Sequence, residues 1–203
     1  MKIQKKSPDG KQIKMEIKYS ILSLIMYSMA FLLVFELSIR GYTLIYFSFN
    51  EHSVLYAFIS LLLAIIYNDA AFYWSHRFMH IKGIFKYVHL QHHKSKNPSP
   101  FSMLSFHPYE TVINAIVYIL IAFIIPIHPI TLGVFLLYNL FNNVAGHDGY
   151  EIMSEKSRKH WLLGKFNTIT NHDTHHAKPN FNYGNYFIFW DWAMNTLYKN
   201  EEG

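Results

Sequence analysis

The sequence contains no cysteine among its 203 residues. Disulfides, cysteine-ligated zinc and iron–sulfur clusters are therefore excluded, and any bound metal must take its ligands from histidine and carboxylate side chains. Charged residues are also scarce, at 15% of the chain, whereas 51% of the residues are hydrophobic and 18% are aromatic. Such a composition is ordinary for a membrane protein with sizeable polar loops, and the length suits about one domain.

Four stretches of the chain carry almost no formal charge. Residues 19–39 and 54–74 contain one charged residue each, and residues 111–127 and 129–145 contain none. A helix that crosses a bilayer needs about 20 apolar residues, so the first two stretches predict spanning helices. The last two are shorter and predict either two spans or a re-entrant hairpin. The expected fold is an all-α, multi-pass membrane helical bundle of about four transmembrane or re-entrant helices, with a cytoplasmic, histidine-rich helical cap.

Lysine and arginine are distributed unevenly between the polar segments. Six lysines precede residue 19, five basic residues lie in 76–110 and six follow residue 146, whereas loop 40–53 contains only Arg40. Cytoplasmic loops of membrane proteins carry an excess of basic residues. The N-terminus, the 76–110 segment and the C-terminal tail are therefore predicted to be cytoplasmic.

The same distribution suggests how the chain is organised. We expect a basic cytoplasmic segment, 1–18, followed by a single membrane-embedded domain, 19–203. The small size without fused domains favours a bacterial cytoplasmic membrane over the endoplasmic reticulum. No nucleic-acid partner is expected, because the basic clusters are not interleaved with exposed aromatic residues on a soluble domain.

Eight histidines on the predicted cytoplasmic side form three short motifs. One motif reads H-x3-H and two read H-x2-H-H: His76 and His80; His89, His92 and His93; His172, His175 and His176. Residues four apart share a helix face, so His76 and His80 can reach one metal ion. Three helical donors within a single turn do not comfortably bind one ion, so each triple is predicted to serve two neighbouring ions. Eight imidazoles give each of two ions about four nitrogen ligands.

Asp69 is a carboxylate inside an apolar stretch, seven residues before His76 and about two helical turns back on the same face. A carboxylate within a membrane segment is costly and usually faces a polar partner. We therefore interpret Asp69 as a partner that accepts an N–H from a metal-ligating imidazole and fixes its orientation.

The histidine motifs and their flanks resemble those of the fatty acid hydroxylase/sterol desaturase superfamily of integral-membrane, non-haem di-iron oxygenases. "DAAFYWSHRFMH" is similar to the family's D-x3-Y-x2-H-R-x2-H, "HPYE" to its H-P-x-E, and "NNVAGHDGY" to its N-x3-H-x-G-Y. "HDTHHAKPNFNYGNYFIFWD" resembles its closing H-x2-H-H with N-Y-G and W-D. The resemblance runs in order over residues 69–198. It departs at Asn195, where the family commonly has the glycine of a G-T pair.

The resemblance implies a di-iron centre that uses dioxygen on a lipid lying in the bilayer. It also implies that His107 and His147 join the eight motif histidines near the metals. Lipid hydroxylation is the expected reaction, and desaturation, carotenoid hydroxylation and ether-lipid cleavage remain open because they share the same motifs. No catalytic side chain beyond the metal ligands and no substrate-binding residue is predicted. The chain has no G-x-G-x-x-G loop and no cysteine, so a separate electron donor or reductase is expected.

Other interpretations of the histidines remain open at this point. The ligand set alone does not choose between iron, copper and zinc. A membrane zinc carrier would need polar ligands along the spans, which hold little beyond Asn68, Asp69 and Glu36. A bis-histidine haem protein could use His76 and His89, but their helix would have to run through Gly83 and the adjacent histidine pairs would be unexplained.

Overall fold

The computed structural model describes residues 1–199. The last residues of the expected 19–203 domain, 200–203, lie outside this described part. Within it the chain is helical, with three isolated β-bridges as its only β pairing. The expected all-α bundle is confirmed. Its four long helices are α1 (Gly10–Ile39), α2 (Val54–Met79), α5 (Pro108–Ile124) and α6 (Pro129–Gly146).

Local sequence signals explain where these helices begin. The carboxylate of Asp9 accepts the Gln12 N–H and caps α1, and the Ser53 hydroxyl accepts the Tyr56 N–H and caps α2. Proline occupies the first position of α5 and of α6, where its missing N–H is not needed. Because of the cap at Asp9, α1 begins nine residues before the apolar stretch that predicted it.

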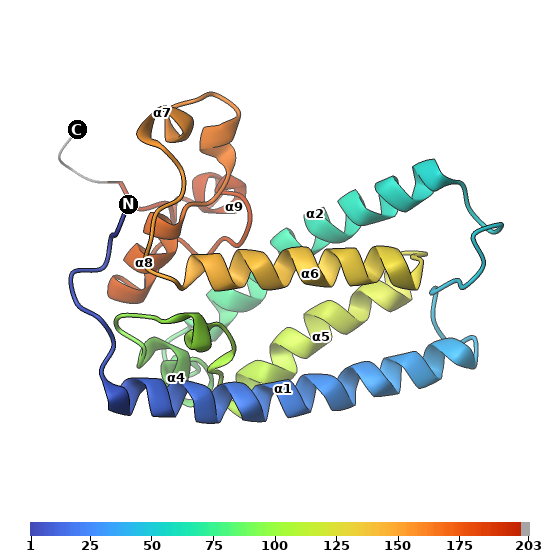
Figure 1. The fold of residues 1–203 in the computed structure, drawn as a ribbon, viewed down its shortest axis with the longest axis horizontal. Coiled ribbons are helices and arrows are strands. Elements are labelled where there is room, and N and C mark those ends of the chain that lie inside the picture. The colour runs from blue at the N-terminus through green and yellow to red at the C-terminus, as the bar shows by residue number, and fades with distance from the viewer. Residues whose placement is uncertain (200–203) are drawn as a thin grey trace.

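The long helices run side by side along the molecule (Figure 1). The helix pairs α1–α5, α2–α5 and α2–α6 are in contact, and a small apolar core lies between them around Ala64, Ile121 and Phe135. Most large side chains of α1 and α2 point outward, including Leu32, which is 67% exposed. An apolar surface this extensive is unlike that of a soluble monomer and suits contact with lipid.

Two helices, α1 and α2, are long and apolar enough to cross a membrane. The 17 residues of α5 and the 18 of α6 give helices about 26 and 27 Å long at 1.5 Å per residue. A bilayer core is about 30 Å thick, so both helices are slightly short for a full span. Whether they form two spans or a re-entrant hairpin stays a prediction.

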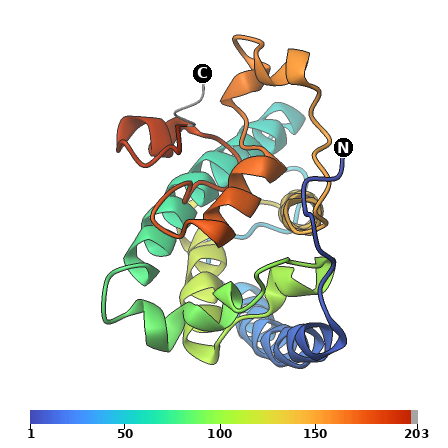
Figure 2. The same ribbon diagram turned by 90° about the vertical axis from the view of Figure 1, so that its left-hand side faces the viewer.

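Seven short helices form a cap at the end of the bundle where α1 begins and where α2 and α6 end (Figures 1 and 2). The N-terminal segment lies along this cap, with the Ile3 N–H bonded to the Gly149 carbonyl at 3.0 Å. The short helices are α3 (Phe85–Val88), α4 (Leu90–His93), η1 (Pro100–Leu104), α7 (Glu155–Arg158), η2 (Leu163–Lys165), α8 (Ile169–Ala177) and α9 (Phe189–Ala193).

The orientation predicted from the basic residues can be tested with single cysteines, because the chain has none of its own. Asn50 is exposed in the loop between α1 and α2, and Lys156 is exposed on α7 in the cap. In intact cells, a membrane-impermeant maleimide should label Asn50→Cys, and it should label Lys156→Cys only after permeabilisation. Labelling of Lys156→Cys in intact cells would contradict the predicted orientation.

Candidate metal centre

Nine of the thirteen histidines meet in the cap as two groups. Within each group, one ring nitrogen from each histidine lies within 4.8 Å of those of the others. We call these groups the five-histidine cluster and the four-histidine cluster. The five-histidine cluster consists of His76, His80, His89, His93 and His175, and the four-histidine cluster of His92, His147, His172 and His176. All eight motif histidines and His147 are thus brought together.

Each H-x2-H-H motif is divided between the two clusters. In the first, His89 and His93 join the five-histidine cluster while His92 joins the other. In the second, on α8, His172 and His176 join the four-histidine cluster while His175 crosses to the five-histidine cluster. The residues four apart stay together because they share a helix face, and the remaining histidine projects to the neighbouring cluster.

Three imidazoles are held at their Nδ1 atoms by backbone carbonyl oxygens. The Nδ1 of His76 lies 2.9 Å from the Tyr183 carbonyl oxygen, and that of His175 lies 2.6 Å from the Phe181 carbonyl oxygen. The Nδ1 of His147 lies 2.7 Å from the carbonyl oxygen of Asn143, four residues earlier in the chain. A carbonyl oxygen can only accept a hydrogen bond, so these Nδ1 atoms carry the proton. In a neutral ring, Nε2 is then unprotonated and has a lone pair that can bind a cation.

The Nε2 atoms point at one another within both clusters. The Nε2–Nε2 distance is 3.0 Å for His76 and His89 and 3.0 Å for His147 and His172. It is 3.1 Å for His93 and His175. Two nitrogens bound at right angles to one metal, each at about 2.1 Å, would be about 3.0 Å apart. The spacing therefore fits ligands that share an ion, whereas facing lone pairs without a cation would repel each other.

Burial keeps these imidazoles neutral. Desolvation lowers the pKa of His93 to about 3 and that of His147 to about 4. The pKa values of His172, His175 and His176 are also lowered, first by burial and then by neighbouring histidines. A metal ligand must be the neutral imidazole, so the folded chain presents these rings in the state that binds a cation.

The expectation for Asp69 requires a correction. Its Oδ1 accepts the backbone N–H groups of Tyr186 at 2.8 Å and Phe187 at 3.1 Å, not an N–H from an imidazole. The segment after α8 folds back against α2 and brings its backbone donors to this carboxylate. Asp191 accepts the N–H groups of Tyr183 and Gly184 in the same way. The two carboxylates thus fix the loop whose carbonyl orients His76.

Glu110 takes the role that the sequence assigned to Asp69. Its Oε1 lies 2.7 Å from Nδ1 of His89, and the residue is 1% exposed. Sequence reasoning did not single it out, although "HPYE" places a carboxylate in the first turn of an apolar helix. Such a buried carboxylate needs a polar partner.

The structure does not bring His107 to either cluster. His107 caps α5, where its Nδ1 accepts the Tyr109 N–H at 3.3 Å, and it lies beside Lys86 and Tyr87 in a separate surface pocket. The proline that follows His107 starts the helix, and this fixes the ring at the helix N-terminus.

The lowered histidine pKa values predict an acid-sensitive metal-free protein. Below about pH 6.5 the unfolded chain takes up protons on these histidines while the folded chain does not, so stability is lost as the pH falls. Each histidine that stays neutral when folded contributes a slope of up to about 1.4 kcal/mol per pH unit. The unfolding temperature of the chelator-treated protein should therefore drop steeply between pH 7 and 5.

The control for this measurement is His160→Gln, because His160 is exposed and outside both clusters. This variant should show the same pH dependence as the unaltered chain. An unfolding temperature that stays constant from pH 7 to 5 would contradict the account.

Comparison with known proteins identifies relatives of the chain. A family profile described as fatty acid hydroxylase matches residues 61–196. The chain is 31% identical over 185 residues to a Delta(7)-sterol 5(6)-desaturase of Gibberella zeae. The aligned region covers 91% of this chain and 54% of the relative. It is 30% identical over 184 residues to a lathosterol oxidase of Homo sapiens, covering 89% of this chain and 59% of the relative.

The similarity extends to a Delta(7)-sterol 5(6)-desaturase of Saccharomyces cerevisiae, at 27% identity over 89% of this chain and 48% of the relative. The chain therefore spans between about half and three fifths of the length of these relatives. No solved structure matches it. Because the family profile covers more than half of its residues, the chain belongs to the fatty acid hydroxylase family.

Proposed function

We propose that the chain is a membrane-bound di-iron oxidoreductase that uses dioxygen and externally supplied electrons to oxidise a C–H bond of a lipid. The observation that carries this proposal is the convergence of Nε2 atoms in two buried clusters, at distances that suit two bound cations. The family supports an oxidoreductase, and the apolar outer faces of α1 and α2 support a substrate that lies in the bilayer.

The two clusters would hold one ion each. Imidazole nitrogens suit iron, copper, nickel and zinc, and the match to the fatty acid hydroxylase family supports iron among them. When reduced, a di-iron centre supplies the activation of dioxygen that removal of hydrogen from an unactivated C–H bond requires. The chain's own residues orient the ligands and exclude water. Tyr183, Phe181 and Asn143 hold ligand rings through backbone carbonyls, and Glu110 holds His89 through its carboxylate.

Hydroxylation of a fatty acyl, sphingolipid or sterol-like substrate is the reaction expected from the motifs. Desaturation is a second candidate with a specific observation in its favour, because relatives from two fungi are named as sterol desaturases. Both reactions begin with the same removal of hydrogen from carbon, so they place the same demands on the ligands and on the fit of the lipid.

The non-enzymatic alternatives fit the described residues less well. Haem ligands would face each other across the iron at about 4 Å, twice a metal–nitrogen bond, with a macrocycle between them. The Nε2 atoms of His76 and His89 are 3.0 Å apart, and the two residues do not share one long helix. His76 lies on α2 and His89 lies between α3 and α4, with the chain turning through Gly83 at a φ of 96°. A zinc carrier would need ligands along the spans, whereas both clusters lie in the cap.

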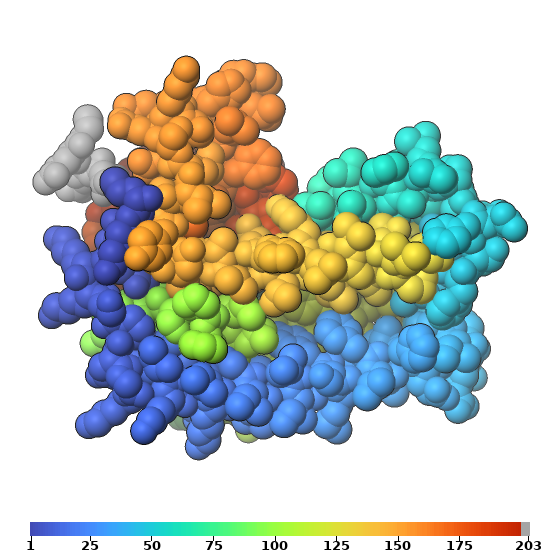
Figure 3. Space-filling view, in the orientation of Figure 1, coloured from blue at the N-terminus to red at the C-terminus, as the bar shows by residue number. Residues whose placement is uncertain are grey.

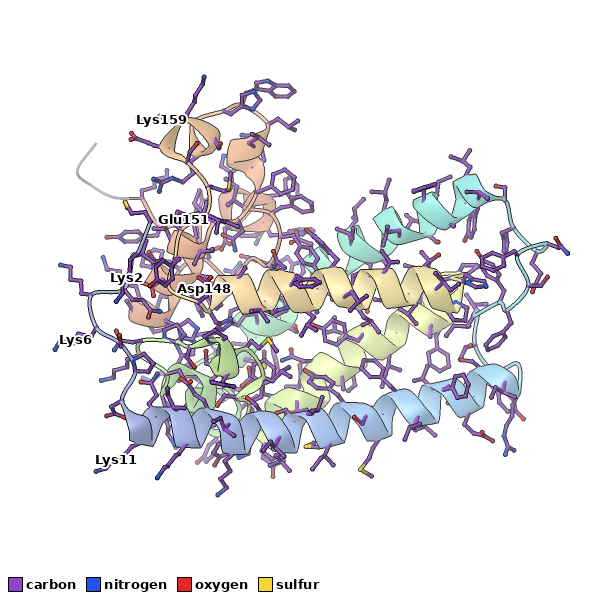
Figure 4. The ribbon with its side chains drawn as sticks, in the orientation of Figure 1. Lys2, Lys6, Lys11, Asp148, Glu151 and Lys159 are labelled. Atoms are coloured by element: carbon purple, nitrogen blue, oxygen red, sulfur yellow. The ribbon has the colours of Figure 1, made fainter. Side chains whose placement is uncertain are left out.

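Electrons would come from a separate carrier. Lysines are exposed at the cap, and Figure 4 shows Lys6 and Lys11 pointing outward from the N-terminal end and Lys159 from the top of the cap. Complementary charge steers the encounter of two proteins. An acidic electron donor docking on the cap is therefore the partner that we propose.

Removing one central ligand from each cluster tests the two-metal proposal. His93 contacts both His80 and His175, and His172 contacts both His147 and His176. Purified without a histidine tag, the unaltered chain should contain about two irons by elemental analysis. His93→Ala and His172→Ala should each contain about one iron, because each loses one central ligand from a different cluster, and lipid oxidation should be lost in both.

The matched control is His160→Ala, which removes an exposed histidine from the same cap. It should keep two irons and full activity. One zinc or no metal in the unaltered chain, with no change in the two cluster variants, would contradict the proposal.

A further inference from the structure

An apolar cavity of about 210 Å³ lies between α1, α5 and α6. Its walls include Leu24 and Phe31 of α1, Tyr118 of α5, and Leu136 and Leu140 of α6. Figure 3 shows α1 and α6 as separate ridges on this face, with the segment near residue 100 between them at the cap end. Leu24 is 55% exposed and Leu140 is 42% exposed, so the cavity reaches the surface that would face lipid.

This cavity adjoins the candidate metal centre. A second cavity, of about 20 Å³, is lined by His76 and His89 of the five-histidine cluster and by His92, His147 and His172 of the four-histidine cluster. The two cavities share five lining residues, Phe72, Met103, Phe106, Asn114 and Asn143. An apolar molecule in the larger cavity would therefore have one part next to both histidine clusters.

Asn114 is a buried polar residue at this junction. It lies on α5, one helical turn after Glu110, and is 5% exposed. Its side-chain Oδ1 is buried without a hydrogen-bond partner, although the great majority of buried polar atoms in proteins are paired. The amide of Asn139 in the same cavity is occupied, since its Nδ2 donates to the Tyr118 hydroxyl and its Oδ1 accepts from the Tyr186 hydroxyl.

We propose that this cavity binds the lipid substrate and that Asn114 Oδ1 accepts a hydrogen bond from a donor that the lipid carries near the carbon to be oxidised. The inference rests on the proposed function and names its substrate class. A ring lipid with a hydroxyl group or a long-chain amide provides such a donor. A plain hydrocarbon chain or a carotene does not, and it would leave the Asn114 oxygen unpaired, which is unfavourable.

Matched lipid pairs test the donor requirement. The first pair is a 3-hydroxysterol and its 3-O-methyl ether, and the second is a long-chain N-acyl amide and its N-methyl derivative. Tritiated lipids are bound to the iron-loaded protein and their affinities are measured by scintillation proximity. The donor-bearing member of at least one pair should bind about tenfold more tightly, a difference of about 1.4 kcal/mol.

Two variants assign this preference to the cavity. Asn114→Leu keeps the branched side-chain shape and removes the acceptor, so the preference should fall to within about twofold. Leu136→Trp fills the cavity and should weaken binding of both members of the pair. The wild-type comparison stands by itself if Asn114→Leu does not fold.

Equal binding within both pairs would overturn the inference, because a water molecule on Asn114 would serve either lipid equally. A preference that persists in Asn114→Leu would also overturn it. Iron counted in the same samples separates this failure from that of the proposed function. Two irons without a donor preference leave the oxidoreductase standing, whereas a donor preference in protein that takes up no iron contradicts the oxidoreductase.

Discussion

Buried imidazole nitrogens that approach one another to about 3 Å are the constraint on which the rest of the cap depends. Backbone carbonyls and one carboxylate fix the proton of several rings on Nδ1, which leaves Nε2 free to bind a cation. Without cations, this arrangement brings ring nitrogens close together where burial disfavours their protonation. Each H-x2-H-H motif is shared between the two clusters, because one turn of helix cannot direct three imidazole rings at one ion.

Residues outside the clusters support this arrangement indirectly, by holding the segments that contact the histidines. Asp69 and Asp191 accept backbone N–H groups of the loop that follows α8, and that loop presents the Tyr183 carbonyl to His76. Glu110, which contacts Nδ1 of His89, lies on α5. The same helix carries Asn114, which lines the apolar cavity. The same helix therefore connects the ligand geometry with the space in which a lipid would lie.

Apolar stretches with almost no charge predicted the long helices, and the histidine motifs on one side of the membrane predicted that their eight histidines would meet. The division of each triple followed from residue spacing along one helix, which can be read directly from the sequence. It did not predict which carboxylate faces an imidazole, because that depends on which distant segment folds against each helix. Asp69 lies on the expected face, but its carboxylate accepts backbone N–H groups of the loop after α8. Glu110 contacts His89 instead. His107 and His147 each stand alone in the sequence, and only the tertiary fold distinguishes the helix cap from the cluster member.

Anomalous scattering at the iron edge, from crystals of the protein grown with iron, tests the central claim most directly. The account predicts two iron peaks, one among His76, His80, His89, His93 and His175 and the other among His92, His147, His172 and His176. A single peak, or peaks at the zinc edge with none at the iron edge, would contradict it.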